Sequence, residues 1–83
     1  MEISRHARNN MRLYNISERD ILNAIESPDV SGKEGDRIVV MKKFQDKFSG
    51  FPLKVVYEKM RNQLFIITAY PIKKKMWRQS RES

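Results

Sequence analysis

His6 and Tyr70 are the side chains in this sequence best suited to moving a proton near a phosphate group. Histidine is the one side chain that titrates near neutral pH without help from its surroundings, and His6 is the only histidine. Tyr70 and Thr68 end a predicted strand, where a phenol can donate a proton or orient a phosphate. Two simpler interpretations stay open: His6 could bond a backbone carbonyl at the edge of a helix, and Tyr70 could pack at a strand end.

A row of arginines lies on the same predicted helix as His6. Arg5, Arg8 and Arg12 are spaced by three and four residues, which puts them on one face of the helix, opposite His6. The row could bind phosphate groups, or it could be an ordinary solvated helix face.

Basic residues also follow the last predicted strand, with Trp77 among them. Cations interleaved with an aromatic ring suit RNA, because the ring can stack on a base while the cations hold phosphates. Trp77 could instead pack against the core. The candidate nucleic-acid contacts outside the first helix are Lys54, Arg61, Lys73, Lys74, Lys75 and Arg78.

The net charge of +7 is unevenly distributed along the 83 residues. Residues 1–36 contain five lysines or arginines and seven acidic residues, whereas residues 37–83 contain twelve and three. A concentrated positive field attracts phosphate-bearing partners and speeds their arrival. The charge pattern therefore indicates a polyanion partner, with RNA as the leading candidate.

Several function classes are disfavoured by composition. The chain has no cysteine and one histidine, so we expect no disulfide, no metal site and no cofactor. The longest apolar run, residues 64–67, is far short of the roughly 20 residues that span a bilayer. The first residues lack the basic-then-apolar pattern of an export signal. We expect a cytoplasmic protein with no membrane association.

One class of chemistry fits the remaining side chains. RNA can be cleaved by its own 2′-hydroxyl, so the protein need supply neither nucleophile nor metal. It needs a proton acceptor, a proton donor and nearby cations. His6 or Glu58 could accept the proton and Tyr70 could donate one, although the pattern favours Glu58 as the ionic partner of Arg61 or Lys54.

Two helices are predicted in the N-terminal part of the chain. Residues 4–14 place Ile3, Ala7, Met11 and Tyr14 on one apolar stripe, with a cap at Ser4 and a stop at Asn15. Residues 18–27 follow a capping box that begins at Ser17, and Pro28 ends that helix. Its predicted buried face is Ile21, Leu22, Ala24 and Ile25.

Three strands are predicted after a connector at residues 31–36: residues 37–44, 53–59 and 63–70. The turn at residues 60–62 is tight, with Asn62 able to take a left-handed conformation. We expect an α+β domain over residues 1–75, followed by a basic tail at 76–83. Its two N-terminal helices would pack on one face of a three-stranded antiparallel sheet, or a four-stranded one.

The last predicted strand divides its side chains between the two faces of that sheet. Phe65, Ile67 and Ala69 form a wholly apolar set, which we assign to the helix-covered core. The other set is Leu64, Ile66, Thr68 and Tyr70. We therefore expect Thr68 and Tyr70 on the open face, with the basic charge beside them.

Short motifs across residues 3–75 resemble a widespread small domain of uncharacterised function. They are Ile3-Ser4-Arg5-His6-Ala7-Arg8, Ile16-Ser17-Glu18-Arg19-Asp20-Ile21, Val55-Val56-Tyr57 and Ile66-Ile67-Thr68-Ala69-Tyr70. The layout is also similar to the BrnT and RelE ribonuclease toxins of toxin–antitoxin pairs. That resemblance implies metal-free RNA cleavage and an acidic antitoxin partner. It implies catalytic roles for His6, Arg12, Thr68 and Tyr70, although Met11-Arg12 reverses the usual motif order.

Three functions are compatible with these patterns. The first is a metal-independent RNA endonuclease of toxin–antitoxin type. The second is a non-catalytic RNA- or DNA-binding module that uses the same basic surface. The third is an interaction domain for an acidic protein.

Overall fold

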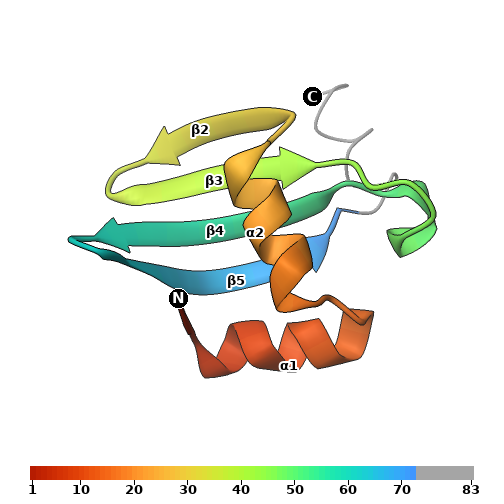
Figure 1. Cartoon of the computed structure of the whole chain (residues 1–83), viewed down its shortest axis with the longest axis horizontal. Coiled ribbons are helices and arrows are strands. Elements are labelled where there is room, and N and C mark those ends of the chain that lie inside the picture. Colours follow the sequence, from red (N-terminus) through yellow and green to blue (C-terminus); the bar gives the residue numbers. More distant parts are fainter. Residues whose placement is uncertain (73–83) are drawn as a thin grey trace.

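Two helices and a five-stranded sheet make up the described part of the chain, residues 1–72 of a computed structural model (Figure 1). In chain order the elements are β1 (Glu2–Ile3), α1 (Arg5–Tyr14), α2 (Glu18–Glu26), β2 (Val30–Glu34), β3 (Arg37–Lys42), the 3-10 turn η1 (Phe48–Gly50), β4 (Leu53–Met60) and β5 (Gln63–Pro71). The sheet order is β1-β5-β4-β3-β2. The α+β class is therefore confirmed.

The sheet is larger than predicted and is mixed. The prediction of an all-antiparallel sheet of three or four strands was wrong, because β1 pairs with β5 in parallel and β2 pairs with β3. The connector at residues 31–36 is in fact β2 and its turn, where Gly35 takes a φ of 65°. Neither missed strand shows apolar alternation: β1 has two residues, and all of β2 is exposed. Their pairing comes from backbone hydrogen bonds to a neighbouring strand.

The helix boundaries follow the capping residues in the sequence. The Ser4 hydroxyl accepts a hydrogen bond from the Ala7 amide, and Asn15 ends α1 with a φ of 57°. Ser17 and Asp20 form the predicted capping box at the start of α2. At the turn between β4 and β5, however, the residue with positive φ is Arg61, at 49°, and not Asn62.

A β-bulge interrupts the pairing of β5 with β4. Tyr57 pairs with Ile66 and Val56 pairs with Thr68, so the half-buried Ile67 has no partner on β4. An extra residue in one strand reverses the alternation of side chains beyond it.

Because of the bulge, the predicted assignment of β5 side chains to the two faces of the sheet is right for only part of the strand. Ile66 is fully buried in the core, whereas Phe65 lies on the other face, so the prediction was wrong before the bulge. After the bulge it was right: Ala69 is fully buried, and Thr68 and Tyr70 lie on the open face opposite Val56 and Lys54.

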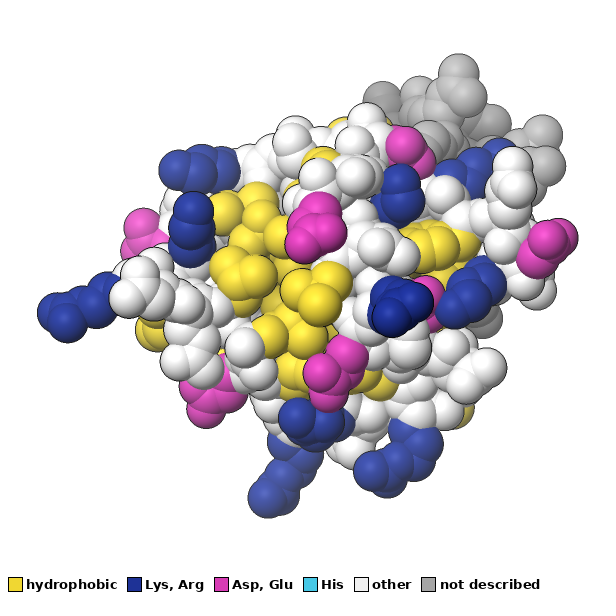
Figure 2. All heavy atoms as spheres, in the orientation of Figure 1, with side chains coloured by type: hydrophobic (Ala, Val, Ile, Leu, Met, Phe, Trp, Pro, Cys, Tyr) yellow, Lys and Arg dark blue, Asp and Glu magenta, His cyan; other side chains and the backbone are white. Residues whose placement is uncertain are grey.

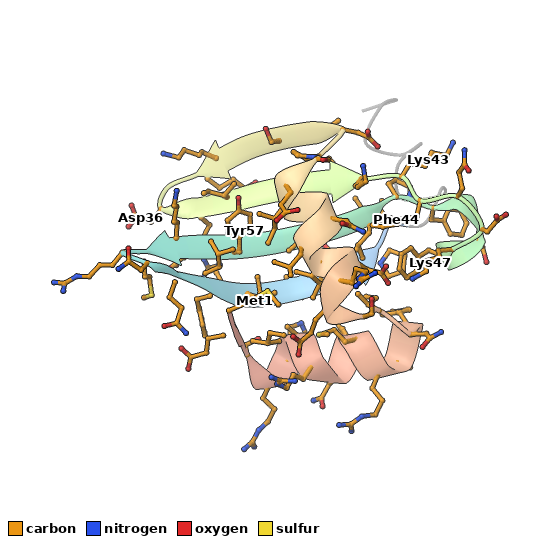
Figure 3. The ribbon with its side chains drawn as sticks, viewed as in Figure 1. Met1, Asp36, Lys43, Phe44, Lys47 and Tyr57 are labelled. Carbon is orange, nitrogen blue, oxygen red and sulfur yellow. The ribbon has the colours of Figure 1, made fainter. Side chains whose placement is uncertain are left out.

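The core lies between the sheet and the two helices. Its fully buried members are Ala7, Ile21, Ala24, Leu53, Val55, Ile66 and Ala69. Leu22 was expected in the core but is 37% exposed. The helix α2 leaves part of the helix-covered face of the sheet exposed. Figure 2 shows hydrophobic side chains gathered there, beside α2. Met1 and Tyr57, labelled in Figure 3, lie in that area.

The helix α1 stands along the edge of the sheet next to β5, and the two run in the same direction (Figure 1). The Ser4 amide donates to the Ile66 carbonyl at 3.0 Å, and the Ser4 hydroxyl donates to the Ile67 carbonyl at 2.7 Å. These bonds attach α1 to the bulged part of β5. Within residues 1–72, no helix is long and apolar enough to cross a membrane.

Candidate functional site

The polar seam between α1 and β5 is the place where predicted site residues come together. The Asn10 side-chain amide donates a hydrogen bond to the Thr68 hydroxyl at 3.4 Å, across the edge of the sheet. His6 is exposed and precedes Asn10 by one helical turn, so the two side chains lie on the same flank of α1. We call His6, Asn10, Thr68 and Tyr70 the seam.

The Tyr70 end of the seam carries a lysine. Lys54 pairs with Tyr70 across the strands, and its Nζ atom lies 5.7 Å from the centre of the Tyr70 ring. This is the geometry of a cation–π contact. Both residues are half-buried, so the ammonium group and the phenol are held side by side on the open face.

The spacing along the seam can be derived from element geometry. Because α1 runs parallel to β5, His6 lies about 6 Å before Asn10 along the helix, at 1.5 Å per residue. Tyr70 lies about 6.6 Å beyond Thr68 along the strand. The His6 and Tyr70 backbones are therefore about 12 Å apart along the seam, with the Asn10–Thr68 pair between them. Both side chains would have to lean inward to reach one phosphodiester.

The arginine row lies on the opposite flank of α1. Arg8 Nη1 lies 4.0 Å from Glu18 Oε2 at the start of α2, so this flank faces the helical side of the molecule. Arg5 and Arg12 share the flank by their spacing, and both are exposed. The structure therefore does not bring Arg12 together with the other three predicted catalytic residues.

Two further predicted residues lie at the other end of the sheet. Glu58 approaches Arg37 at 3.8 Å, so its partner is neither Arg61 nor Lys54, the two proposed from the sequence. Glu58 is also about 13 Å along β4 from Lys54, too far to act as a base beside Tyr70. Arg61 is in the β4–β5 turn, at the opposite end of β4 from Lys54. Neither residue belongs to the seam.

The open face is less basic than expected in its described part. Its pairing register places an apolar band of Val30, Val39, Met41, Val56 and Phe65 across the antiparallel strands. The charged side chains on this face are Lys54, the Arg37–Glu58 pair, Glu34 and Glu2. The expectation of a concentrated positive charge on this face is therefore wrong for residues 1–72, where the other cations lie on the two helices, in the loops and on the helix-covered side of the strands.

An ion pair between an exposed lysine and a buried carboxylate anchors the loop between β3 and β4. Lys47 Nζ donates to both carboxylate oxygens of Asp20, at 2.7 and 2.9 Å, and the Asp20 side chain is 5% exposed. Burial alone would raise the pKa of Asp20, but the hydrogen bonds from Lys47 and from the Ser17 backbone outweigh it and hold the pKa below its usual value. The loop is thus fastened to the N-terminus of α2.

The lysine run at residues 73–75, Trp77 and Arg78 lie outside the described residues, as does the predicted tail at 76–83. Among residues 1–72, no group of three or more His, Asp or Glu side chains is arranged to hold a metal ion. Asn10 was not predicted as a site residue. Its spacing of four from His6 was the available signal, but only the path of α1 along β5 shows what Asn10 contacts.

Fold and seam together define a small α+β domain with two helices against a five-stranded mixed sheet and a polar contact between α1 and β5 at one edge. A family model described as a domain of unknown function, DUF4258, matches residues 3–71, which is most of the chain. The protein belongs to this family. No curated protein and no solved structure matches the chain significantly.

Proposed function

We propose that this protein is a metal-independent RNA endonuclease of toxin–antitoxin type, whose catalytic groups lie along the seam. The observation that carries the proposal is the hydrogen bond between Asn10 and Thr68. It holds two neutral hydrogen-bonding groups between a histidine and a tyrosine. A phosphodiester placed on this pair would have His6 on one side and Tyr70 on the other.

The reaction would use the 2′-hydroxyl of the RNA as nucleophile. His6 removes the proton of that hydroxyl, and the 2′-oxygen forms a bond to phosphorus. The bond from phosphorus to the 5′-oxygen breaks as Tyr70 donates a proton to that oxygen. The products are a 2′,3′-cyclic phosphate and a 5′-hydroxyl, and proton exchange with water returns both side chains to their starting forms.

Charge stabilisation would come from the Tyr70 end of the seam. The Lys54 ammonium group, 5.7 Å from the Tyr70 ring centre, lies near enough to offset the negative charge that develops at phosphorus and on the leaving oxygen. Asn10 and Thr68 can donate hydrogen bonds to the non-bridging oxygens. Arg12 has no part in this scheme because it lies on the other flank of α1, with Arg8 and Glu18.

The test is cleavage of a defined RNA by purified protein in EDTA. We expect cleavage to fall by about 100-fold or more in His6→Ala, the usual range for loss of a general base, and by a comparable factor in Tyr70→Phe. Arg12→Gln is the matched control on the same helix and should cleave at nearly the wild-type rate when the RNA is saturating. A single 2′-deoxy substitution at the cleaved nucleotide should abolish cleavage there and leave binding intact.

Wild-type activity in both His6→Ala and Tyr70→Phe would refute the proposed site. Loss of activity in Arg12→Gln alone would move the catalytic centre to the arginine row. Products that end in a 3′-hydroxyl would exclude attack by the 2′-hydroxyl.

A second function, a non-catalytic RNA- or DNA-binding module, is favoured by the exposure of His6, because a general base is usually held in a more enclosed position. Binding of the RNA without any cleavage in the same assay would select it. The third function, an interaction domain for an acidic protein, draws support from the apolar band on the open face. The third function is compatible with the first, because an acidic antitoxin that binds the toxin in the cytoplasm would cover its catalytic site.

A further inference from the structure

An aromatic pocket opens at the end of the sheet where the seam finishes. Tyr14 from the last turn of α1, Phe48, Ser49 and Phe51 from the loop before β4, and Pro71 from β5 line it. Its volume is about 270 Å³. Pro71 directly follows Tyr70, so the pocket lies at the Tyr70 end of the seam. Tyr14 and Phe51 remain partly exposed, so their rings are accessible.

The wall of the pocket has an unusual backbone. Asp46, Phe48 and Ser49 have φ values of 62°, 56° and 52°, in the left-handed region that non-glycine residues rarely occupy. Such conformations persist where the surrounding structure holds them, and they gather at ligand sites. Here the Phe51 amide donates to the Phe48 carbonyl at 2.9 Å, and the Phe48 ring packs edge-on against Phe44 at 5.6 Å.

The Lys47–Asp20 pair described above ties the loop to α2, and two rings of the loop, Phe44 and Phe48, pack on each other and against the core. Figure 3 shows Lys43, Phe44 and Lys47 together at this end of the sheet. The aromatic wall is therefore preorganised, which lowers the entropy lost when a ligand binds.

The charge around the pocket indicates what it binds. Arg12 occupies the same last turn of α1 as Tyr14, and Lys43 lies beside Phe44 at this end of the sheet (Figure 3); both cations are exposed, whereas the Lys47 ammonium group is already bound by Asp20. Rings that can stack, bordered by cations that can hold phosphates, are the two components of single-stranded nucleic-acid sites. A proline-rich peptide also fits aromatic grooves, but it gives no use to the cations.

We propose that this pocket receives one unstacked base of single-stranded RNA, stacked on Tyr14 and Phe51, next to the phosphate held at the seam. The inference rests on the proposed function only in taking RNA as the ligand. It assigns Arg12 to the neighbouring phosphate of the same strand, away from the cleaved bond. A base held here would select a flexible, unpaired stretch of RNA over a duplex, whose bases remain stacked.

The experiment measures binding of a 2′-O-methyl oligoribonucleotide, which lacks the attacking hydroxyl and is not cleaved. One internal base is 2-aminopurine, whose fluorescence is quenched by stacking, and affinity is measured at several salt concentrations. Tyr14→Ala should weaken binding roughly 5- to 100-fold and restore the fluorescence, without changing the slope of affinity against salt. Tyr14→Trp should retain binding.

Matched variants separate stacking from packing and from charge. Phe51→Leu keeps an apolar side chain and removes the ring, so it should weaken binding in the same way. Arg12→Gln should instead reduce the salt slope, because it removes a phosphate contact. Leu13→Ala is the neutral control, since Leu13 is 71% exposed on the same helix and does not line the pocket.

Wild-type affinity and quenching in both Tyr14→Ala and Phe51→Leu, with unchanged melting temperatures, would overturn the inference. So would equal binding of an oligonucleotide with an abasic site in place of the quenched base. Capture of a proline-rich peptide in preference to RNA would assign the pocket to a protein partner. These outcomes are independent of the cleavage assay, because loss of cleavage in His6→Ala leaves base stacking unaffected.

Discussion

The two faces of the sheet use the same strands for different purposes. On the covered face, alternate residues of β4 and β5 such as Leu53, Val55 and Ile66 are fully buried under the helices. On the open face, their neighbours Lys54, Val56 and Thr68 are only half-buried and combine charged, apolar and hydroxyl groups. Directly under the helices the covered face holds close-packed apolar groups, whereas the open face is free to carry polar groups with other roles.

The helix α1 contributes side chains to both the covered face and the open face because it stands at the sheet edge. Ala7 is fully buried in the core, while Asn10 reaches Thr68 on the open face. Arg8 pairs with Glu18 toward the helical side. One ten-residue helix thus fastens the core and presents two separate polar flanks. Side chains of one helix can therefore belong to different sites.

The largest expected effect is the difference in stability loss when a side chain is shortened on the covered face or on the open face of β4. Leu53→Ala should lower the free energy of unfolding by about 2–5 kcal/mol, because it leaves a cavity under the helices. Val56→Ala, on the open face, should cost about 1 kcal/mol, since its side chain is only half-buried. Urea unfolding followed by circular dichroism measures both. Equal losses would mean that something also covers the open face in solution.

The next largest effect concerns the ion pair that fastens the loop on the covered side. Asp20→Asn should lower the free energy of unfolding by about 1–2 kcal/mol at neutral pH, because a charge-assisted hydrogen bond to Lys47 becomes a neutral one. Lys47→Gln should show a similar loss. The double variant should lose little more than either single variant if the two side chains act through each other.

The same pair predicts a pH dependence. The pKa of Asp20 is lower in the folded protein than the ordinary 3.8, so its stabilising effect is complete above that pH and is lost as the pH falls through the folded value. The difference in stability between wild type and Asp20→Asn should therefore be constant from pH 5 to 7 and should shrink below about pH 4. A difference that shrinks instead as the pH rises above 7 would contradict this assignment.

The smallest expected effect concerns the Asn10–Thr68 contact on the open face. Asn10→Ala and Thr68→Val should each destabilise the protein by roughly 0.5–1 kcal/mol, and a double-mutant cycle should give a coupling of a few tenths of a kcal/mol, because the 3.4 Å bond is long and partly exposed. If the pair cradles a phosphate, both variants should lower cleavage by more than this loss of stability explains. Parallel stability and cleavage assays separate the two effects.

Local patterns in the sequence predicted the helices and three of the strands well. Ser4, Asn15 and the Ser17–Asp20 capping box mark helix ends through bonds between near neighbours, and the structure contains all of them. The strands β1 and β2 were missed because β1 is only two residues long and β2 is exposed along its whole length. Edge strands of this kind are held by backbone bonds, which leave no apolar signature.

The candidate site was predicted less completely than the fold. Thr68 and Tyr70 were placed on the open face, and they lie there. The path of α1 along β5 makes Asn10 the residue that contacts Thr68 and leaves Arg12 on the other flank. The aromatic pocket was not foreseen, because its lining residues come from three segments that are far apart in the sequence.

By itself the sequence determined the α+β class, the helix boundaries and the polarity of most side chains, since capping, periodicity and charge act over a few residues. Only the tertiary structure decided which polar residues meet. The bulge at Ile67 sets which side chains before Thr68 are buried, and the parallel pairing of β1 aligns α1 with β5. Both depend on hydrogen bonds between residues about sixty positions apart or on the opposite strand, and no local pattern records them.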